Sequence, residues 1–175
     1  MTRHIVTSFD EDLRSVSAKI SEMGGLAEQQ LAQALESIAA RDTELAEQVI
    51  ASDRRLDGME IKLDEAAVQI LALRQPMASD LREIVAALKI ASTLERIGDL
   101  AKNIAKRARV MNQSQPLKVG GSIVRMGKQV QGLMAEVLDA YVARDTALAI
   151  SVWRRDVEID EMYNSLFREL ITYMM

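Results

Sequence analysis

Apolar side chains recur every three to four positions over long stretches of this chain. In residues 45–73 the recurring positions are Leu45, Val49, Leu56, Met59, Leu63, Ala66, Ile70 and Leu73. In residues 87–108 they are Ala87, Ile90, Leu94, Ile97, Ala101, Ile104 and Ala108. This spacing matches the 3.6-residue turn of an α-helix, so each stretch predicts an amphipathic helix with one apolar face.

Capping and turn residues predict where the first helices begin and end. A first helix is expected from about Ser8 to Ala39, because Ser8 followed by Glu11 has the spacing of a capping box. The Arg41-Asp42-Thr43 segment predicts a turn in which Asp42 or Thr43 caps the second helix. Pro76 ends that helix and is expected near the first turn of a third one. Short turns between long helices favour antiparallel packing.

The chain contains an internal duplication. The segment Ala40-Arg41-Asp42-Thr43-x-Leu45-Ala46 recurs as Ala143-Arg144-Asp145-Thr146-x-Leu148-Ala149, an offset of 103 residues. At the same offset Met23-Gly24, Leu35, Asp53, Asp57, Met59 and Leu63 match Met126-Gly127, Leu138, Asp156, Asp160, Met162 and Leu166. No gap is needed over about fifty residues, so we interpret the two segments as copies of one unit.

The duplication predicts an all-α fold of tandem antiparallel three-helix bundles. The first three-helix repeat occupies residues 1–112, and a polar linker containing Pro116 occupies residues 113–121. The second repeat, residues 122–175, is expected to supply two helices, at about 123–142 and from 146 onward. The counterpart of the third helix would begin near residue 180, so we expect a truncated second bundle with an exposed apolar seam. Self-association would bury such a seam.

Composition narrows the function classes. The chain has no cysteine, which excludes disulfides and thiolate chemistry, and aromatic residues make up only 3%. The net charge of −4 makes nucleic acid a poor partner. No signal peptide or membrane span is evident, so a cytoplasmic location is expected.

A basic cluster near the end of the third predicted helix consists of Lys102, Lys106, Arg107 and Arg109. We interpret these cations as favoured by the dipole at a helix C-terminus, with binding to an acidic partner surface as the alternative.

Acidic residues form stripes on the second and third predicted helices. Asp53, Asp57, Glu60 and Asp64 fall at i, i+4, i+7 and i+11, and Glu95, Asp99 and Asn103 follow one another at four-residue steps. If the turn centres near Pro76, antiparallel packing places Asp57 beside Glu95 and Asp53 beside Asp99. A bound cation would relieve the repulsion between these carboxylates, and oxygen ligands suit Mg, Mn or Fe. A solvated acidic face without metal is the alternative.

The duplication separates these acids into two groups. Only Asp53 and Asp57 recur in the second copy, as Asp156 and Asp160. Glu60 and Asp64 are replaced there by Tyr163 and Phe167. Retention of the Asp53–Asp57 pair supports the cation-site hypothesis, and a generic charged surface stays the alternative.

The same residues carry a family resemblance. Leu94-Glu95-Arg96-Ile97-Gly98-Asp99-Leu100-Ala101-x-Asn103-Ile104-Ala105 is similar to the signature helix of PhoU proteins. Asp53-x-x-x-Asp57 and Asp156-x-x-x-Asp160 resemble the paired acidic motifs of that family, and Phe9-Asp10-x-x-Leu13 resembles its beginning. The likeness covers the whole chain.

The resemblance implies a six-helix protein of two three-helix bundles, often dimeric, with metal clusters on the acidic motifs in some members. By carry-over, Asp53, Asp57, Glu95 and Asp99 would form a first metal site, with Glu60 and Asn103 as possible additional ligands. Asp156 and Asp160 would form half of a second site. Iron, manganese, magnesium or zinc would be the metal.

The resemblance also implies a regulatory role without catalysis. PhoU-like proteins restrain phosphate uptake and phosphate-starvation signalling by contacting the ATPase subunit of a phosphate ABC transporter and a sensor histidine kinase. They would reach the membrane only through those partners. The alternative is a metal-independent helical adaptor whose acidic groove binds a basic partner.

Enzymatic alternatives lack their usual residues. A carboxylate-bridged di-metal enzyme usually adds Glu-x-x-His motifs, but the only histidine is His4 near the N-terminus. The same fact argues against a histidine phosphotransfer module.

Trp153, the only tryptophan, is expected to be a packing anchor, with a partner surface as the alternative.

Overall fold

A computed structural model describes residues 2–116 and 119–175, with side chains from residue 9 onward. The described residues form six helices: α1 (Thr2–Ala39), α2 (Thr43–Arg74), α3 (Ser79–Met111), α4 (Gly120–Ala143), α5 (Thr146–Arg154) and α6 (Asp156–Met174). The predicted all-α fold class is confirmed.

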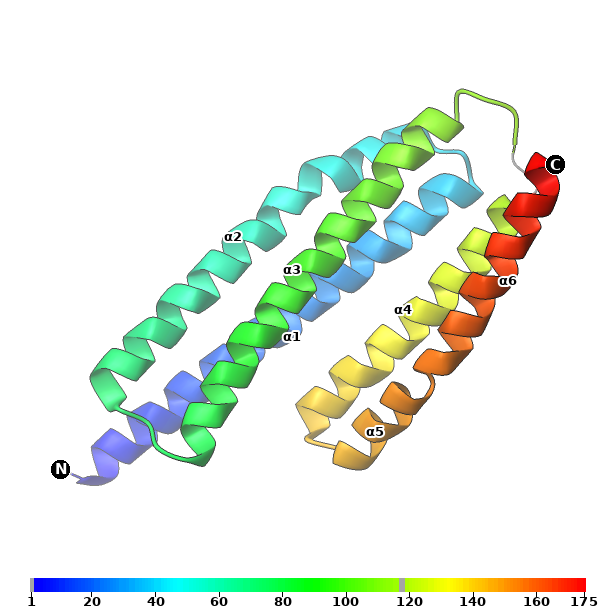
Figure 1. Ribbon diagram of the computed structural model, residues 1–175. Coiled ribbons are helices and arrows are strands. Elements are labelled where there is room, and N and C mark those ends of the chain that lie inside the picture. The colour runs from blue at the N-terminus through cyan, green and yellow to red at the C-terminus, as the bar shows by residue number, and fades with distance from the viewer. Residues whose placement is uncertain (1, 117–118) are drawn as a thin grey trace.

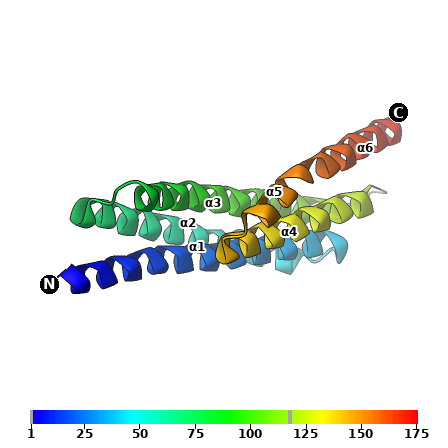
Figure 2. The ribbon, with the colours of Figure 1, turned by 90° about the horizontal axis from the view of Figure 1, so that it is seen from below.

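The helices are arranged as a three-helix bundle followed by a helical hairpin (Figure 1). Helices α1, α2 and α3 contact one another pairwise, and α4 packs alongside α1. In the described part of the chain, α5 and α6 contact only α4 and each other. Figure 2 shows the consequence, because α6 rises away from the first bundle. The second repeat therefore joins the first through α1 and α4.

The core of the first bundle follows the predicted apolar stripes. On α3, the buried seam includes Ala87, Leu94, Ala101 and Ala108, all at most 4% exposed. Small alanine side chains let the neighbouring helices approach closely, and larger residues from α1 and α2 fill the remaining space. On α2, the buried members of the stripe are Val49, Leu56, Leu63 and Ile70, whereas Leu73 at its end is 70% exposed.

The turn shared by the two repeats has the same backbone geometry in both copies. Arg41 and Arg144 both adopt the left-handed conformation, with φ of 55°. In each copy the next residue is an N-cap: the side chains of Asp42 and Asp145 accept a hydrogen bond from the backbone N–H three residues later, at 2.9 Å. Asp42 is thus the cap, and Thr43 is the first helical residue. The two copies differ in what the arginine side chain contacts.

Two predicted helix boundaries are wrong. Helix α1 already begins at Thr2, so Ser8 lies inside the helix and does not cap it. The helix expected from residue 146 onward is interrupted at Arg155, which separates α5 from α6. At that interruption the guanidinium of Arg155 donates to both carboxylate oxygens of Glu136 on α4, at 2.7 and 2.8 Å. This contact between helices has no signal in the local sequence pattern.

Pro76 also lies slightly outside its expected position. Helix α2 ends at Arg74 and α3 begins at Ser79, so Pro76 belongs to the connection between them. Gln75 and Ala78 on either side have φ values of 48° and 50°. The reversal still brings α2 and α3 together as antiparallel neighbours.

The α5–α6 arm exposes many apolar side chains. The large ones are Ile150, Trp153, Val157, Tyr163, Phe167, Ile171, Tyr173 and Met174. Trp153 is 75% exposed, so the interpretation of this residue as a packing anchor is wrong. The arm contacts only α4 among the described helices, and one neighbour cannot cover all its apolar side chains.

Candidate functional site: an acidic ridge between two helices

The antiparallel pairing of α2 and α3 brings predicted acidic residues together. We call this group the acidic ridge: Asp53, Asp57 and Glu60 from α2, and Glu95 and Asp99 from α3. Burial raises the pKa of the Glu95 carboxyl above its ordinary value. Repulsion from the other four carboxylates, Asp99 foremost, raises it further. The other four acids therefore lie close enough to Glu95 to act on its carboxyl electrostatically.

Asp53 is the innermost acid of the ridge. It is only 4% exposed and belongs to the buried face of α2. Its Oδ2 atom accepts a hydrogen bond from Nζ of Lys102 on α3. A buried carboxylate needs such a partner, because leaving the charge unpaired is strongly unfavourable.

Lys102 bridges the two helices of the ridge. Besides Asp53, its Nζ donates to Oδ1 of Asp99, one turn earlier on the same helix, at 3.1 Å. Hydrogen bonds to Asp53 and then Asp99 hold the pKa of the Lys102 ammonium well above its usual range. One positive charge is thus shared by the two acids that sequence reasoning placed at matching heights.

A glycine allows α3 to approach its neighbours at the height of the ridge. Gly98 lies between Glu95 and Asp99 in the sequence and is buried on α3. A Cβ at this position would lie 2.5 Å from Leu56 Cδ2 and 2.8 Å from Gln30 Oε1, too close for either atom. The absence of a side chain at Gly98 therefore brings the acids of α3 nearer to those of α2.

The remaining predicted site residues lie apart from this cluster or at its edge. Asn103 is exposed on α3. Asp156 and Asp160 are exposed near the start of α6. Helix α6 lies beside α4, away from α2 (Figure 1). Asp156 corresponds to the buried Asp53 by the duplication. No described helix covers it as α3 covers Asp53.

The ridge fits a metal only in part. Its carboxylate oxygens are the donors that hard cations prefer, and the pKa of Glu95 is raised by burial first and then by the neighbouring negative charges. Among the side chains from residue 9 onward that the structure describes, however, no three acidic or histidine groups lie close enough together to hold a metal ion. The Lys102 ammonium occupies the space between Asp53 and Asp99.

Sequence reasoning missed both Lys102 and Gly98 as parts of the site. Lys102 was grouped with the basic cluster near the end of the helix. A signal was available, since Asp99 and Lys102 are at i, i+3 and therefore on the same helix face. The pairing of Lys102 with Asp53, forty-nine residues earlier, is a tertiary contact.

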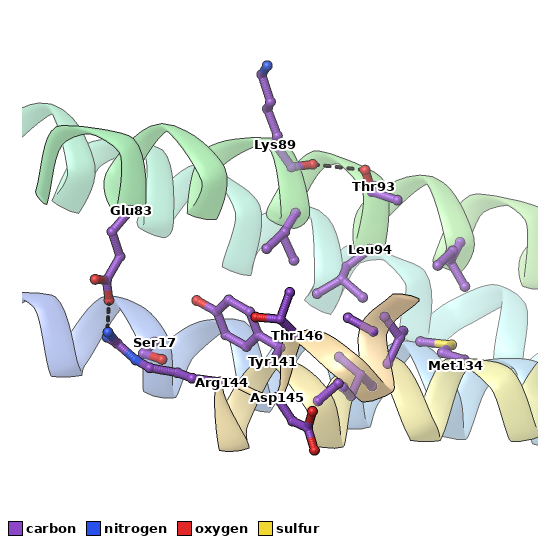
Figure 3. A pocket seen from close by; sticks show the side chains of 16 residues that line it. Ser17, Glu83, Lys89, Thr93, Leu94, Met134, Tyr141, Arg144, Asp145 and Thr146 are labelled. Atoms are coloured by element: carbon purple, nitrogen blue, oxygen red, sulfur yellow. Dashed lines mark hydrogen bonds and ion pairs between the residues drawn. The ribbon is translucent and has the colours of Figure 1, made fainter. Parts of the chain in front are cut away.

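A second concave surface lies between α3 and the α4–α5 hairpin (Figure 3). It encloses about 660 Å³ and is lined mainly by apolar side chains, among them Ile90, Leu94, Met134, Leu138 and Tyr141. Arg144 reaches across one end to Glu83, and its Nη2 donates to Glu83 Oε1 at 2.7 Å. The groove lies between α3 and α4 because both helices pack on α1 while their backbones stay apart.

None of the helices in residues 2–116 and 119–175 combines the length and the apolar character needed to cross a bilayer.

Comparison with known proteins places these features in one family. The family model of the PhoU domain matches residues 20–108 and 123–175, one segment in each repeat. The chain is 52% identical over 176 residues to a phosphate-specific transport system accessory protein PhoU homolog from Caulobacter vibrioides, covering all of this chain and 76% of that protein. It is 38% identical over 177 residues to the accessory protein PhoU of Escherichia coli, covering all of this chain and 73% of that protein.

A solved structure agrees with the sequence relatives. The crystal structure of PhoU from Pseudomonas aeruginosa superposes with a TM-score of 0.92 at 40% identity, covering 95% of this chain and 80% of that one. The helical fold agrees with this solved structure, and the family model matches two segments of the chain. The chain therefore belongs to the PhoU family, whose named relatives here are accessory proteins of phosphate-specific transport.

Proposed function

We propose that this chain is a negative regulator of phosphate uptake and of phosphate-starvation signalling, acting through protein contacts and not through catalysis. The observation that carries the proposal is the family match in both repeats, together with relatives named as phosphate-specific transport accessory proteins along the whole chain. An accessory protein of a transport system acts by binding transport components or the proteins that control them.

The proposed partners are the ATPase subunit of a phosphate ABC transporter and a sensor histidine kinase. Contact with them would bring the chain to the membrane indirectly, from the cytoplasm. The long helices support this proposal because they offer extended faces of charged residues, and the α5–α6 arm adds exposed apolar side chains. A homodimer is part of the proposal, since association between copies would cover part of that arm.

We further propose that a divalent or trivalent metal ion assists this role at the acidic ridge. Iron, manganese, magnesium and zinc are the candidates. Asp53, Asp57, Glu95 and Asp99 would hold it, with Glu60 and Asn103 as additional ligands, and Asp156 and Asp160 would contribute half of a second site. The metal would supply positive charge between α2 and α3. The pKa of Glu95, raised by burial and then by repulsion from the neighbouring carboxylates, supports the proposal.

A tagged pull-down from phosphate-replete cells tests the regulatory role. We expect mass spectrometry to identify the transporter ATPase subunit or a sensor kinase. Recovery of neither partner in mild, cation-containing buffer would contradict the proposed contacts.

The Asp53→Ala/Asp57→Ala double variant tests metal assistance. Unchanged metal content in that variant, measured by elemental analysis, would exclude the first-repeat site.

The second candidate is a metal-independent adaptor whose acidic ridge binds a basic partner surface. One observation favours it: the ammonium of Lys102 already lies on Asp53 and Asp99, so the protein itself shows how a basic side chain fits there. Partner capture that survives complete chelation of metal would support this adaptor over the metal-assisted regulator.

A further inference from the structure

Helix α3 carries a row of cations on its outer face. Arg82, Lys89 and Arg96 follow one another at seven-residue steps, and Arg107 comes eleven residues later. Seven residues make about two helical turns and eleven make about three, so all four side chains lie along one side of the helix. All four are exposed, and none forms an ion pair with another residue that the structure describes. We call this row the basic stripe.

The surroundings of the basic stripe are apolar. Val85, Leu100 and Val110 are exposed between its cations or beside them. The apolar groove between α3 and α4 runs along one edge of the stripe, and Lys89 lies on the rim with its side chain pointing out of the groove (Figure 3). A surface that combines unpaired cations with apolar side chains fits a partner that offers acidic and apolar side chains together.

Helix α6 presents a surface of that kind. It carries five acidic residues and only one basic residue. Asp156 and Asp160 lie one turn apart, and Tyr163, Phe167 and Ile171 continue the same face at three- and four-residue steps. All five side chains are exposed. Since α6 rises away from the first bundle (Figure 2), this face of α6 is accessible to a second molecule.

Length and charge favour a second copy of this chain as the partner. At about 1.5 Å per residue, the basic stripe extends over about 37 Å from Arg82 to Arg107, and the 19 residues of α6 extend over about 28 Å. The whole chain has a net charge of −4, so two copies repel each other except where a basic surface meets an acidic one. Within one copy the backbones of α3 and α6 stay apart.

We propose that α3 and α6 form the interface of a two-fold dimer, in which the described face of α6 in each copy lies along the basic stripe of the other. The proposal rests on the homodimer of the proposed function and deepens it by naming its surfaces. Asp156 and Asp160 would pair with cations of the stripe, while Tyr163 and Phe167 would cover its apolar side chains. Each copy offers one surface and receives the other, so the contact is made twice and closes.

Paired charge reversals provide the test. Lys89→Glu/Arg96→Glu places acids opposite the acids of α6, and Asp156→Lys/Asp160→Lys places cations opposite the basic stripe. Each variant alone should dissociate at least about tenfold more readily than the unaltered chain in analytical ultracentrifugation, because like charges then face each other. An equimolar mixture of the two variants should dimerise about as tightly as the unaltered chain, since both contacts of the mixed dimer again join opposite charges.

A matched control separates the interface from the effect of net charge. Arg54→Glu/Lys62→Glu makes the same change in net charge at exposed positions of α2. This variant should dissociate within about twofold of the unaltered chain. Circular dichroism checks that every variant keeps its helix content, and Arg96→Glu alone repeats the test with a smaller change.

The outcomes separate this interface from the regulatory role. A monomeric unaltered chain would overturn the dimer, while the contacts with transport components, tested by the pull-down, would stand. A mixture that stays monomeric, or a control that weakens self-association as much as Lys89→Glu/Arg96→Glu does, would also overturn the interface. Binding of the unaltered chain to vesicles of anionic lipid that Lys89→Glu/Arg96→Glu abolishes, with self-association unchanged, would assign the basic stripe to a membrane surface instead.

Discussion

Leu138 of α4 packs directly on Gly24 of α1, so closely that a Cβ at Gly24 would lie 2.5 Å from Leu138 Cδ2. The same contact occurs in reverse, with Leu35 of α1 packed on Gly127 of α4. Gly24 and Gly127 are equivalent by the duplication, and so are Leu35 and Leu138. The two repeats are thus joined by one leucine-on-glycine contact made twice, in the manner of a two-fold interface.

This contact predicts different effects of alanine at two adjacent glycines. Both Gly24 and Gly25 lie inside α1, where alanine favours the helix by about 1 kcal/mol over glycine. A Cβ at Gly25 meets nothing within 4 Å, so Gly25→Ala should stabilise the chain. Gly24→Ala must push Leu138 away and should be less stable than Gly25→Ala by about 1–3 kcal/mol. Urea denaturation checks this, and equal stability of the two variants would show that Leu138 moves without cost.

Gly98 predicts a similar comparison inside the first bundle. Gly98→Ala should lower the free energy of unfolding by about 1–3 kcal/mol, because the new Cβ would meet both Leu56 and the buried Gln30 amide. Gly58→Ala is the control, since a Cβ there meets nothing within 4 Å. Thermal melts followed by circular dichroism would compare them. A Gly98→Ala variant as stable as Gly58→Ala would contradict the close approach of α3.

The duplication supplies a matched pair of aspartates for testing the role of burial. Asp53→Asn removes the buried partner of Lys102 and should lower the free energy of unfolding by about 1–3 kcal/mol. Asp156→Asn, at the equivalent but exposed position, should change it by less than about 0.5 kcal/mol. Both are measured by urea denaturation in the presence of a chelator. Similar effects at the two positions would mean that the Lys102 contact contributes little.

Glu95 predicts a dependence of stability on pH. Its pKa is raised in the folded state, so the folded chain binds the proton more readily than the unfolded chain, whose carboxyl has the ordinary value of 4.5. The ionised carboxylate therefore opposes folding, and this contribution grows as pH rises from 4.5 through the folded-state pKa. Glu95→Gln removes it and should stabilise the chain at neutral pH by about 0.2–0.5 kcal/mol.

The gain from Glu95→Gln should shrink as the pH falls toward 4.5, where the carboxylate of the unaltered chain takes up a proton. Denaturation of both chains across this pH range, without metal, measures the difference. Glu65→Gln is the control, because Glu65 is an exposed acid elsewhere on α2. A gain from Glu95→Gln that is independent of pH, or no larger than that from Glu65→Gln, would contradict the argument.

Helix geometry alone predicted which acids of α2 and α3 lie at the same height in the acidic ridge. Every helical residue advances the chain by about 1.5 Å, so the distances of Asp53 and Asp99 from the turn at Pro76 fix their heights on antiparallel helices. That calculation requires no knowledge of packing, and the structure places both acids on one lysine. The Asp42 cap was equally predictable, because a cap is a contact between residues three positions apart.

The sequence by itself determined the helical class, the duplication and the faces on which the acids lie, because these depend on periodicity and on neighbours within one or two turns. The tertiary structure decided the rest. The contact of Lys102 with Asp53, the interruption at Arg155 beside Glu136 and the exposure of Trp153 all depend on which helix lies opposite. A periodic pattern states that a face is apolar or charged, but burial and pairing are properties of two surfaces, and the second is distant in sequence.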